Sequence, residues 1–445
     1  VSIDPLETET VRFWENHGEF NDAEPAKIQT EVFMLPSTCF AEDEGSFTNS
    51  SRTIIWHWKA GDAPGEARTD TAIMAELFLR LRDIYKKDGG KGAEPFLKVD
   101  WSFKDPKLPT ADELIREING KALVDLKDPT DPTKVVKKAG DQLDIFAQMR
   151  DDGTTSGGNW IYTGCYSSRG NLTARRDNSD PSGLNVFGLW GYAWPANRRV
   201  LYNRASADVN GKAWSERKKY IAWDGSKWAG PDVPDFPPTL APEKGAGPFI
   251  MNPEGVSRLW VRKLMADGPF PEHYEPFESP VANLLHPKTS NTPVARVFKG
   301  DMEVFGKAKD FPYVATTYKL VEHFHFWSKH AKRNAVMQPE AFAEISEELA
   351  KEKGIKPGSW VRVWSNRGSV KCKAVVTKRI PVLKIDGKTQ HVVGLPFHFG
   401  FVGETKKNIG VNSLTPYVGD ANTNTPEYKA FLVDIEPLKG PAPVA

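Results

Sequence analysis

The chain has 445 residues, of which 39% are hydrophobic, and it carries 59 basic side chains against 58 acidic ones. This length predicts two to four domains with ordinary apolar cores, and the balanced charge disfavours nucleic acid or an anionic membrane as a partner. No stretch reaches the ~18 apolar residues of a membrane span, and the first residues lack the pattern of a signal peptide.

The first 95 residues have the pattern of an α/β layer. Val1 and Ile3 fit the end of a buried strand that stops at Asp4 and Pro5, and residues 30–36 fit a second strand. A doubly wound layer collects ligand sites at the carboxyl ends of its strands, so we expect such sites at Asp4 and after Pro36.

A helix is predicted after these strands. It begins at Thr69 or Asp70, either of which can act as the N-cap. Its apolar positions recur at helical spacing, which predicts a helix buried on one face. These positions are Ile73, Leu77, Leu81 and Ile84.

The three cysteines, Cys39, Cys165 and Cys372, are too far apart to form a CxxC-type ligand pair. The sequence therefore predicts neither a zinc nor an iron–sulfur site on this chain. We expect packed or half-exposed thiols instead.

Most of the 14 Trp and 34 Pro residues lie between Trp101 and Pro293, which predicts irregular loops pinned by large aromatic side chains. Only short elements are expected there, such as a helix over residues 111–118. We interpret residues 96–300 as an irregular insertion.

The last part of the chain predicts a mostly β domain. Residues 311–318 form a strand that enters a polar turn, and an amphipathic helix runs from Pro339 to about Lys353, where Gly354 stops it. Residues 360–380 form a hairpin with its turn at 366–368, and 391–397 form another strand. We expect a barrel with one helix packed on it.

His323 and His325 are separated by one residue in the polar turn. On a strand they would face the same side and could bind zinc or copper. A packed or surface pair and a ligand-binding loop are the alternatives.

Three motifs carry a resemblance to a family: TTYKLVEHFHFWSKH at 316–330, GVNSLTP at 410–416 and NTPEYKAFLVDIE at 424–436. In order and spacing they resemble the dinucleotide-binding barrel of the bis-pterin molybdenum and tungsten oxidoreductases. PSTCFAEDEGSFTNSSR at 36–52 and APGEARTD at 63–70 are similar to the end of the Rossmann-like domain of that family.

Four further segments resemble the large subunits of respiratory and sulfate-reducer formate dehydrogenases, which carry a long insertion. They are residues 150–164, 174–184, 197–208 and 268–278. The resemblance implies an α/β plus mostly-β fold: the end of a Rossmann-like domain at 1–95, the Pro- and Trp-rich insertion at 96–300, and a six-stranded, double-psi-like barrel at 301–445.

The resemblance also implies cofactor-binding residues. They are Lys319, His323, His325, Ser328, Asn412, Tyr428 and Lys429, together with Asp70 and Asp4. Chemically, a pyrophosphate requires cations and N–H groups, and a guanine requires a carboxylate. Lys319 stands where many relatives have Arg, so the charge is kept but the bidentate fork is lost. Without the family, Lys429 would be a solvated surface lysine and Asp70 a helix cap.

The implied activity is the oxidation of formate to CO2, or the reverse, at a bis-molybdopterin guanine dinucleotide centre with molybdenum or tungsten. No catalytic or metal-binding residue is assigned to this chain, because the family places the catalytic Cys or selenocysteine and a [4Fe–4S] motif in an N-terminal half. That half and an iron–sulfur electron-transfer subunit are the expected partners, without nucleic acid or a direct membrane span.

A periplasmic location is expected, with the signal on the other half, and a cytoplasmic one is the alternative. The rival functions are those of another bis-pterin reductase, acting on nitrate, polysulfide or arsenate, or of a non-enzymatic binding module suggested by the Trp-rich centre.

Overall fold

The structure is a computed structural model that describes residues 1–15, 24–49, 52–193, 197, 206–232, 234, 237–244, 266–267, 272–298, 300 and 305–440. Most of the 197–208 motif and the beginning of the 268–278 motif lie outside these residues. The chain divides into two compact units. The first unit consists of Val1–Ser2, Leu6–Met34 and Val261–Ala445, and the second consists of Ile3–Pro5 and Leu35–Trp260. The boundaries at residues 95 and 300 stay predictions.

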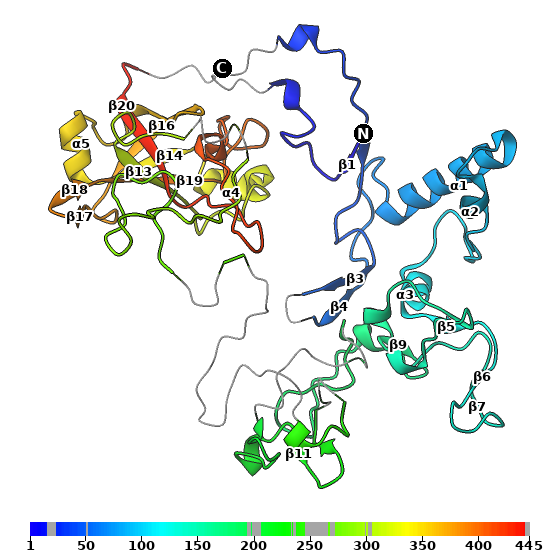
Figure 1. Cartoon of the computed structure of the whole chain (residues 1–445). Helices are drawn as coiled ribbons and strands as arrows, with labels where there is room; N and C mark the ends of the chain where they lie inside the picture. Colours follow the sequence, from blue (N-terminus) through cyan, green and yellow to red (C-terminus); the bar gives the residue numbers. More distant parts are fainter. Residues whose placement is uncertain are drawn as a thin grey trace. The chain divides into compact units, whose positions relative to one another are not determined.

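A closed six-stranded β-barrel dominates the first unit (Figure 1). In order around the barrel, the strands are β13 (Tyr313–Tyr318), β19 (Val392–Pro396), β14 (Phe342–Ile345), β16 (Ser369–Val376), β15 (Trp360–Trp364) and β20 (Phe431–Pro437). Alternate side chains of β13 and β15 are buried, as expected for strands with one face toward a core. The predicted six-stranded barrel is confirmed.

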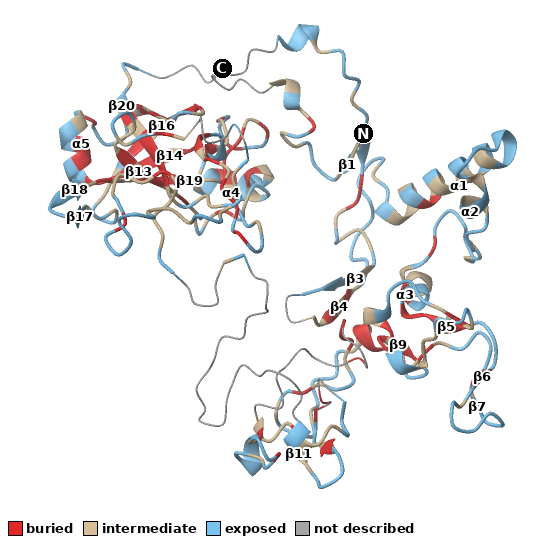
Figure 2. Ribbon diagram, in the orientation of Figure 1, coloured by how far each residue is buried: buried red, intermediate tan, exposed pale blue. Residues whose placement is uncertain are grey.

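Apolar side chains from every strand form the core of the barrel. Figure 2 colours buried residues red, and they recur along the barrel strands. Val361, Leu395 and Phe431 are completely buried. Each such side chain contributes about 1.5–3 kcal/mol through the removal of apolar surface from water. The barrel therefore has its own core and can hold rigidly the loops that leave its ends.

The helix predicted from Pro339 is wrong over its first half. Residues Phe342–Ile345 form β14, which pairs in parallel with β16, and only Glu347–Lys353 form a helix, α5. Ser346 caps α5 by accepting a hydrogen bond from the amide of Leu349. As predicted, Gly354 ends the helix, in the left-handed conformation that favours glycine. Pairing within the barrel outweighed local helical propensity in this segment.

The hairpin predicted over residues 360–380 is confirmed, because β15 and β16 pair in antiparallel fashion with Trp364 opposite Ser369. Three further elements complete the regular structure around the barrel. They are α4 (Lys332–Met337), β17 (Leu383–Ile385) and β18 (Lys388–Gln390).

Apart from α1, the described elements of the second unit are short. Its helices are α1 (Asp70–Asp88), α2 (Ala93–Leu97) and α3 (Ala111–Asn119). Its longer hairpin joins β3 (Gly45–Thr48) to β4 (Ile54–His57). The other strands are β5 (Lys121–Ala122), β6 (Leu126–Lys127), β7 (Val135–Lys137), β8 (Thr155–Ser156), β9 (Tyr166–Ser167), β10 (Gly170–Asn171), β11 (Ala222–Trp223) and β12 (Trp228–Ala229).

The predicted doubly wound layer is not confirmed. Among the described residues, strand β1 (Ser2–Asp4) pairs with β2 (Met34–Pro36) alone, and the strands of the second unit likewise form two-stranded sheets. Val1 is 86% exposed and Ile3 is also exposed, so the expectation of a buried first strand is wrong for this chain.

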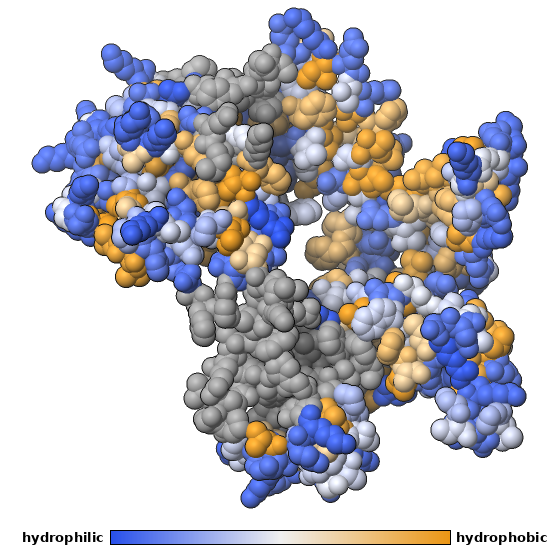
Figure 3. Space-filling view, in the orientation of Figure 1, coloured by the Kyte–Doolittle hydropathy of each residue, from blue (hydrophilic) through white to orange (hydrophobic). Residues whose placement is uncertain are grey.

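Helix α1 lies where it was predicted, but its burial was not predicted correctly. Thr69 is the N-cap and accepts a hydrogen bond from the amide of Ala72, while Asp70 is the first helical residue. Leu77 and Leu81 are 47% and 38% exposed, and Figure 3 shows apolar side chains on the surface of this helix. An uncovered apolar face of this kind is typical of a surface that another protein segment covers.

The described helices include none that combines the length and the apolar character needed to cross a membrane.

The expectation of packed or half-exposed thiols is confirmed. Cys165 and Cys372 are buried and Cys39 is half-buried, and all three are free. Burial raises the pKa of both buried thiols to about 12, because a thiolate loses its hydration there. We expect a thiol reagent at about pH 8 to modify Cys39 alone in the folded protein and all three cysteines after unfolding. Mass spectrometry of the labelled peptides would measure this, and rapid labelling of Cys372 in the folded state would contradict it.

Candidate functional site

Three strand ends meet at one end of the barrel. Strands β13 and β19 are parallel, with Tyr318 opposite Pro396, so both chains leave the barrel at the same end. Strand β20 runs antiparallel to β13, so the residues just before Phe431 arrive at that end as well. The side chains gathered there are called the barrel-end cluster; they are Lys319, His323, His325, Ser328, His398 and Lys429.

His323 and Ser328 organise the loop after β13. His323 is buried; its Nε2 lies 2.9 Å from the carbonyl oxygen of Gln338 and its Nδ1 lies 2.8 Å from Ser328 Oγ. Ser328 Oγ also accepts a hydrogen bond from the amide of Phe324. Both ring nitrogens of His323 are therefore occupied within the protein, and the pair shapes the loop. A direct contact of either side chain with a cofactor stays a prediction.

His325 differs from His323. It lies in a loop with a φ of 45°, so the strand geometry needed for a shared metal site is not formed. Its ring packs against Phe397 and Phe324, and no described residue forms a hydrogen bond with its ring nitrogens. The described residues also contain no group of three potential metal-binding side chains. His325 is thus the histidine of the polar turn that can offer a ring nitrogen to a ligand.

His398, which the sequence analysis missed, connects the two loops. It is completely buried, and its Nε2 accepts a hydrogen bond of 2.9 Å from the amide of Leu320. Its Nδ1 therefore carries the proton and donates it to the carbonyl oxygen of His325 at 2.6 Å. The second Phe-His-Phe triplet, at 397–399 after a predicted strand, was the available sequence signal.

Burial lowers the pKa of His398, and repulsion from His323, His325 and Lys319 lowers it further. The neutral ring is the form that can accept from one amide and donate to one carbonyl. The histidine therefore acts as a fixed, uncharged connection between the two loops.

Replacement of His398 by leucine should destabilise the barrel by about 1–3 kcal/mol, because it leaves the amide of Leu320 and the carbonyl of His325 without a partner. The pKa of His398 is lower in the folded than in the unfolded state, so the unfolded state binds a proton first as pH falls. The contribution of His398 to stability is therefore full above its unfolded pKa and is lost as pH falls toward its folded pKa. Denaturant titrations at about pH 7 and pH 5 should show a smaller loss for the variant than for the wild type. The exposed His286→Leu is the control, and an equal loss in all three proteins would contradict the assignment.

Two lysines give the cluster a positive charge. Lys429 Nζ donates to the carbonyl oxygen of Thr317 at 2.7 Å, across the β13–β20 pair. Burial lowers the pKa of Lys429, and the nearby charge of Lys319 lowers it further. Among the described residues, no carboxylate forms an ion pair with either lysine. Adjacent cations without a carboxylate between them favour a bound anion.

The remaining predicted residues are not all brought together. The carbonyl oxygen of Tyr428 accepts from Thr317 Oγ1 beside the cluster. Asn412 is exposed on the 3-10 helix η12 (Val411–Leu414), which contacts β16. Asp4 and Asp70 belong to the second unit, where the main-chain oxygen of Asp4 accepts from Ser37 and Asp70 lies exposed in the first turn of α1.

The donor set fits a nucleotide pyrophosphate. Lys319 and Lys429 supply positive charge, and His325 supplies a free ring nitrogen beside them. Pyrophosphate oxygens are acceptors that form their strongest hydrogen bonds with charged donors. The cluster offers donors of this kind, and among the described residues neither lysine is paired with a carboxylate.

Residues 313–432 match the family described as "Molydopterin dinucleotide binding domain". The chain is 55% identical over 438 residues to "Formate dehydrogenase-O major subunit" of Escherichia coli (strain K12), covering 98% of this chain and 43% of that protein. It is 42% identical over 445 residues to "Formate dehydrogenase 2 subunit alpha (cytochrome c-553)" of Nitratidesulfovibrio vulgaris, covering 96% of this chain and 42% of that protein.

The chain thus spans less than half the length of the curated relatives that it matches. One solved structure, "Acetylene Hydratase from Pelobacter acetylenicus", aligns with 91% of this chain and 38% of its own at a TM-score of 0.39 and 12% identity, which is too distant to bear on the fold.

Proposed function

This chain belongs to the family of formate dehydrogenase major subunits, and from that premise we propose that its barrel holds the dinucleotide part of a bis-pterin cofactor in a formate-oxidising assembly. The observation that carries the proposal is the pair Lys319 and Lys429, two neighbouring cations at the barrel end without an acidic partner among the described residues. A single exposed lysine would need no ligand, but two that repel each other gain stability when an anion lies between them.

Each residue of the cluster has a distinct role in this proposal. Lys319 and Lys429 bind the phosphate oxygens, and the ring of His325 donates a further hydrogen bond. His398 and the pair His323 and Ser328 hold the loops in place. Because Lys319 is not Arg, it contacts phosphate as a point charge.

Further contacts to the cofactor are proposed for Asn412 and Tyr428 beside the barrel. Asp70 and Asp4 are the candidates for the guanine, because a carboxylate can accept from its N1–H and its amino group. Asp70 is not the helix cap, so its carboxylate is not committed to the first turn of α1 in that way.

When bound, the cofactor supplies the two-electron chemistry that converts formate to CO2 or the reverse, with molybdenum or tungsten at its centre. The residues of this chain position it and stabilise its negative charge. We assign the catalytic Cys or selenocysteine and a [4Fe–4S] cluster to a partner polypeptide, and electron transfer to an iron–sulfur subunit. The exposed apolar face of α1 supports a covering partner. A periplasmic location of the assembly is part of the proposal.

The assembly should be purified under native, anaerobic conditions and analysed for metal and for fluorescent pterin. We expect molybdenum or tungsten, a pterin dinucleotide, a co-purifying polypeptide with a CxxCxxxC-type motif, and reduction of a dye that depends on formate. A preparation with neither metal nor pterin would overturn the proposal and favour a non-enzymatic binding module. Dye oxidation by nitrate, polysulfide or arsenate without any response to formate would favour another bis-pterin reductase.

A further inference from the structure

Glu278 is a buried carboxylate of the first unit that does not belong to the barrel-end cluster. Glu278 is 1% exposed, and its carboxylate forms a bidentate ion pair with Arg367 at 2.6 and 3.0 Å. It also accepts from the amides of Gly306 at 2.6 Å and Leu432 at 2.8 Å. Four hydrogen bonds therefore converge on one carboxylate, and removal of one partner from a buried ion pair is strongly destabilising.

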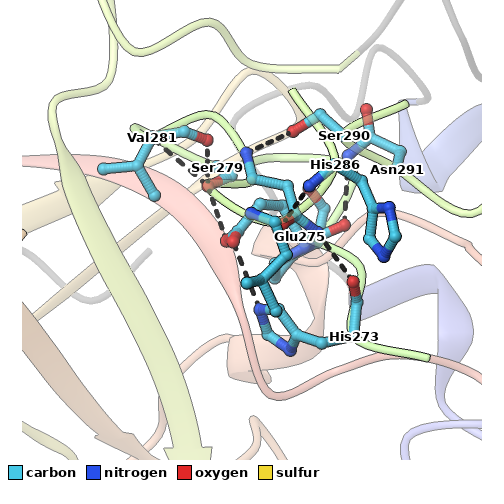
Figure 4. Close-up of polar contacts among 10 residues, drawn as sticks. His273, Glu275, Ser279, Val281, His286, Ser290 and Asn291 are labelled. Atoms are coloured by element: carbon cyan, nitrogen blue, oxygen red, sulfur yellow. Dashed lines mark hydrogen bonds and ion pairs between the residues drawn. The ribbon is translucent and has the colours of Figure 1, made fainter. Parts of the chain in front are cut away.

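Glu278 belongs to a loop, residues 272–292, that has many internal hydrogen bonds. Figure 4 draws several of them, including contacts of Glu275, Ser279 and Ser290. The amide of Glu275 donates to the carbonyl of Ser290 at 2.8 Å, and Asn291 Nδ2 donates to the carbonyl of Pro276 at 2.7 Å. The buried Asn283 closes the loop through the carbonyl of His273 and the hydroxyl of Ser290. These internal hydrogen bonds hold the shape of the loop, so a displacement of Glu278 would move the loop as one piece.

The contacts of Glu278 end on the two segments that flank the predicted cofactor residues. Strand β15 pairs with β20 as far as Trp364 opposite Asp434. Two residues earlier in β20, the amide of Leu432 donates to the Glu278 carboxylate instead of to a strand. Arg367 meanwhile donates to the carbonyl oxygen of Leu414, the last residue of η12. One carboxylate therefore fixes the beginning of β20 and, through Arg367, the end of η12.

Close packing shows that this connection is tight. A Cβ added at Gly306 would lie 3.4 Å from the Glu278 carboxylate and 3.0 Å from the ring of Phe311. The amide of Gly306 lies 2.6 Å from the same carboxylate, so the backbone packs directly against it. The carboxylate thus has little room to shift without breaking several hydrogen bonds together.

We propose that Glu278 is a positioning residue for the cofactor: it ties loop 272–292 to the start of β20, which follows Tyr428 and Lys429, and to η12, which carries Asn412. This inference rests on the proposed function. Glu278 itself touches no predicted cofactor residue, and it acts through Leu432 and Arg367.

The test compares Glu278→Gln with Asp434→Asn in the complete assembly. Asp434 is a second acid of the barrel, paired with Lys353 at 2.8 Å, so both changes convert an acid to its amide and break one ion pair. In Glu278→Gln one carboxylate oxygen becomes an NH2 group, and at either position this group faces two of the four donors. Two donors repel each other, so attraction becomes repulsion there. Arg367→Lys is the milder variant, since lysine keeps the charge but cannot hold Glu278 bidentately and Leu414 together.

Two measurements read out the role. Hydrogen exchange should become faster in residues 410–416 and 424–432 of Glu278→Gln and Arg367→Lys but stay unchanged there in Asp434→Asn. Pterin release on dilution should be followed by fluorescence at a temperature well below that of unfolding. It should be about tenfold faster in Glu278→Gln and Arg367→Lys, equivalent to about 1.4 kcal/mol. Release and exchange equal to those of Asp434→Asn would overturn the role of Glu278. Absence of pterin from the wild-type assembly would overturn the proposed function instead.

Discussion

Replacement of both Lys319 and Lys429 by glutamine should cause the largest loss of cofactor binding of any change in the barrel. Each lysine forms a charge-assisted contact with phosphate in the proposed site, and such contacts contribute about 1.5–3 kcal/mol. We therefore expect each single variant to release the pterin dinucleotide about 10–100-fold faster, and the double variant to purify without it.

The control for this prediction is Lys384→Gln with Lys388→Gln, which removes two exposed lysines from the β17–β18 hairpin of the same unit. Both double variants change the net charge equally, so a general effect of charge would appear in both. Added salt should weaken pterin binding more in the wild type than in either single variant, and pterin content after gel filtration measures the loss in the double variant at 319 and 429. Full pterin content in that variant would refute the assignment of the site.

Glu9→Gln should cause the largest loss of barrel stability. Lys329 is completely buried beside Glu9, which is the partner of its ammonium group and also accepts from the amide of Val402. Removal of the carboxylate leaves a buried charge without compensation, which destabilises by about 3–5 kcal/mol. Denaturant unfolding would measure the loss, and Glu7→Gln is the control, since its exposed pair with Arg12 contributes about 0–1 kcal/mol.

The pH dependence gives this prediction a sign. The pKa of Glu9 is lowered even though burial opposes it, because Lys329 and the amide of Val402 stabilise the carboxylate. Its contribution is present above the unfolded pKa and is lost as pH falls through the folded pKa. Burial lowers the pKa of Lys329 despite the opposing effect of Glu9. As pH rises, the folded state therefore releases this proton before the unfolded state does.

Without Glu9, Lys329 should lose its proton more readily, and the destabilisation should be smaller at about pH 10 than at about pH 7. Glu9→Gln combined with Lys329→Met should recover most of the lost stability, because no buried charge then remains. A destabilisation that is independent of pH, and that the second change does not relieve, would show that the pair is not the cause.

Local patterns predicted many of the elements. Alternation of apolar residues located β15, and residues 311–318 were predicted as the strand that contains β13. Gly354 marked the end of α5, and the turn at 366–368 marked the hairpin. Each of these signals acts over a few residues, so it can be read without the rest of the fold. The strand β14 was missed because its four residues are too short to show a period and are defined by their partner β16.

The candidate site was predicted in part. Lys319 and Lys429 came from motifs about 110 positions apart, and the pairing of β13 with β20 is what brings them together. His398 and Glu278 were not predicted as site residues, although His398 stands in the Phe-His-Phe triplet and Glu278 ends the motif at 268–278. Each matters through contacts with distant backbone groups, which no local pattern shows. The apolar spacing of α1 predicted the helix correctly but not its burial: Leu77 and Leu81 are exposed, because burial depends on packing partners that a local pattern does not specify.

The sequence alone determined the composition of the candidate site: lysines, histidines and amides in three ordered motifs. Only the tertiary structure decided which of them meet. Barrel closure sets the register between strands far apart in the chain, and that register places Lys319 beside Lys429 while Asp4 and Asp70 lie in another unit. Burial then decided the roles, because a polar group removed from water must find its partners within the fold, as His323, His398 and Glu278 do.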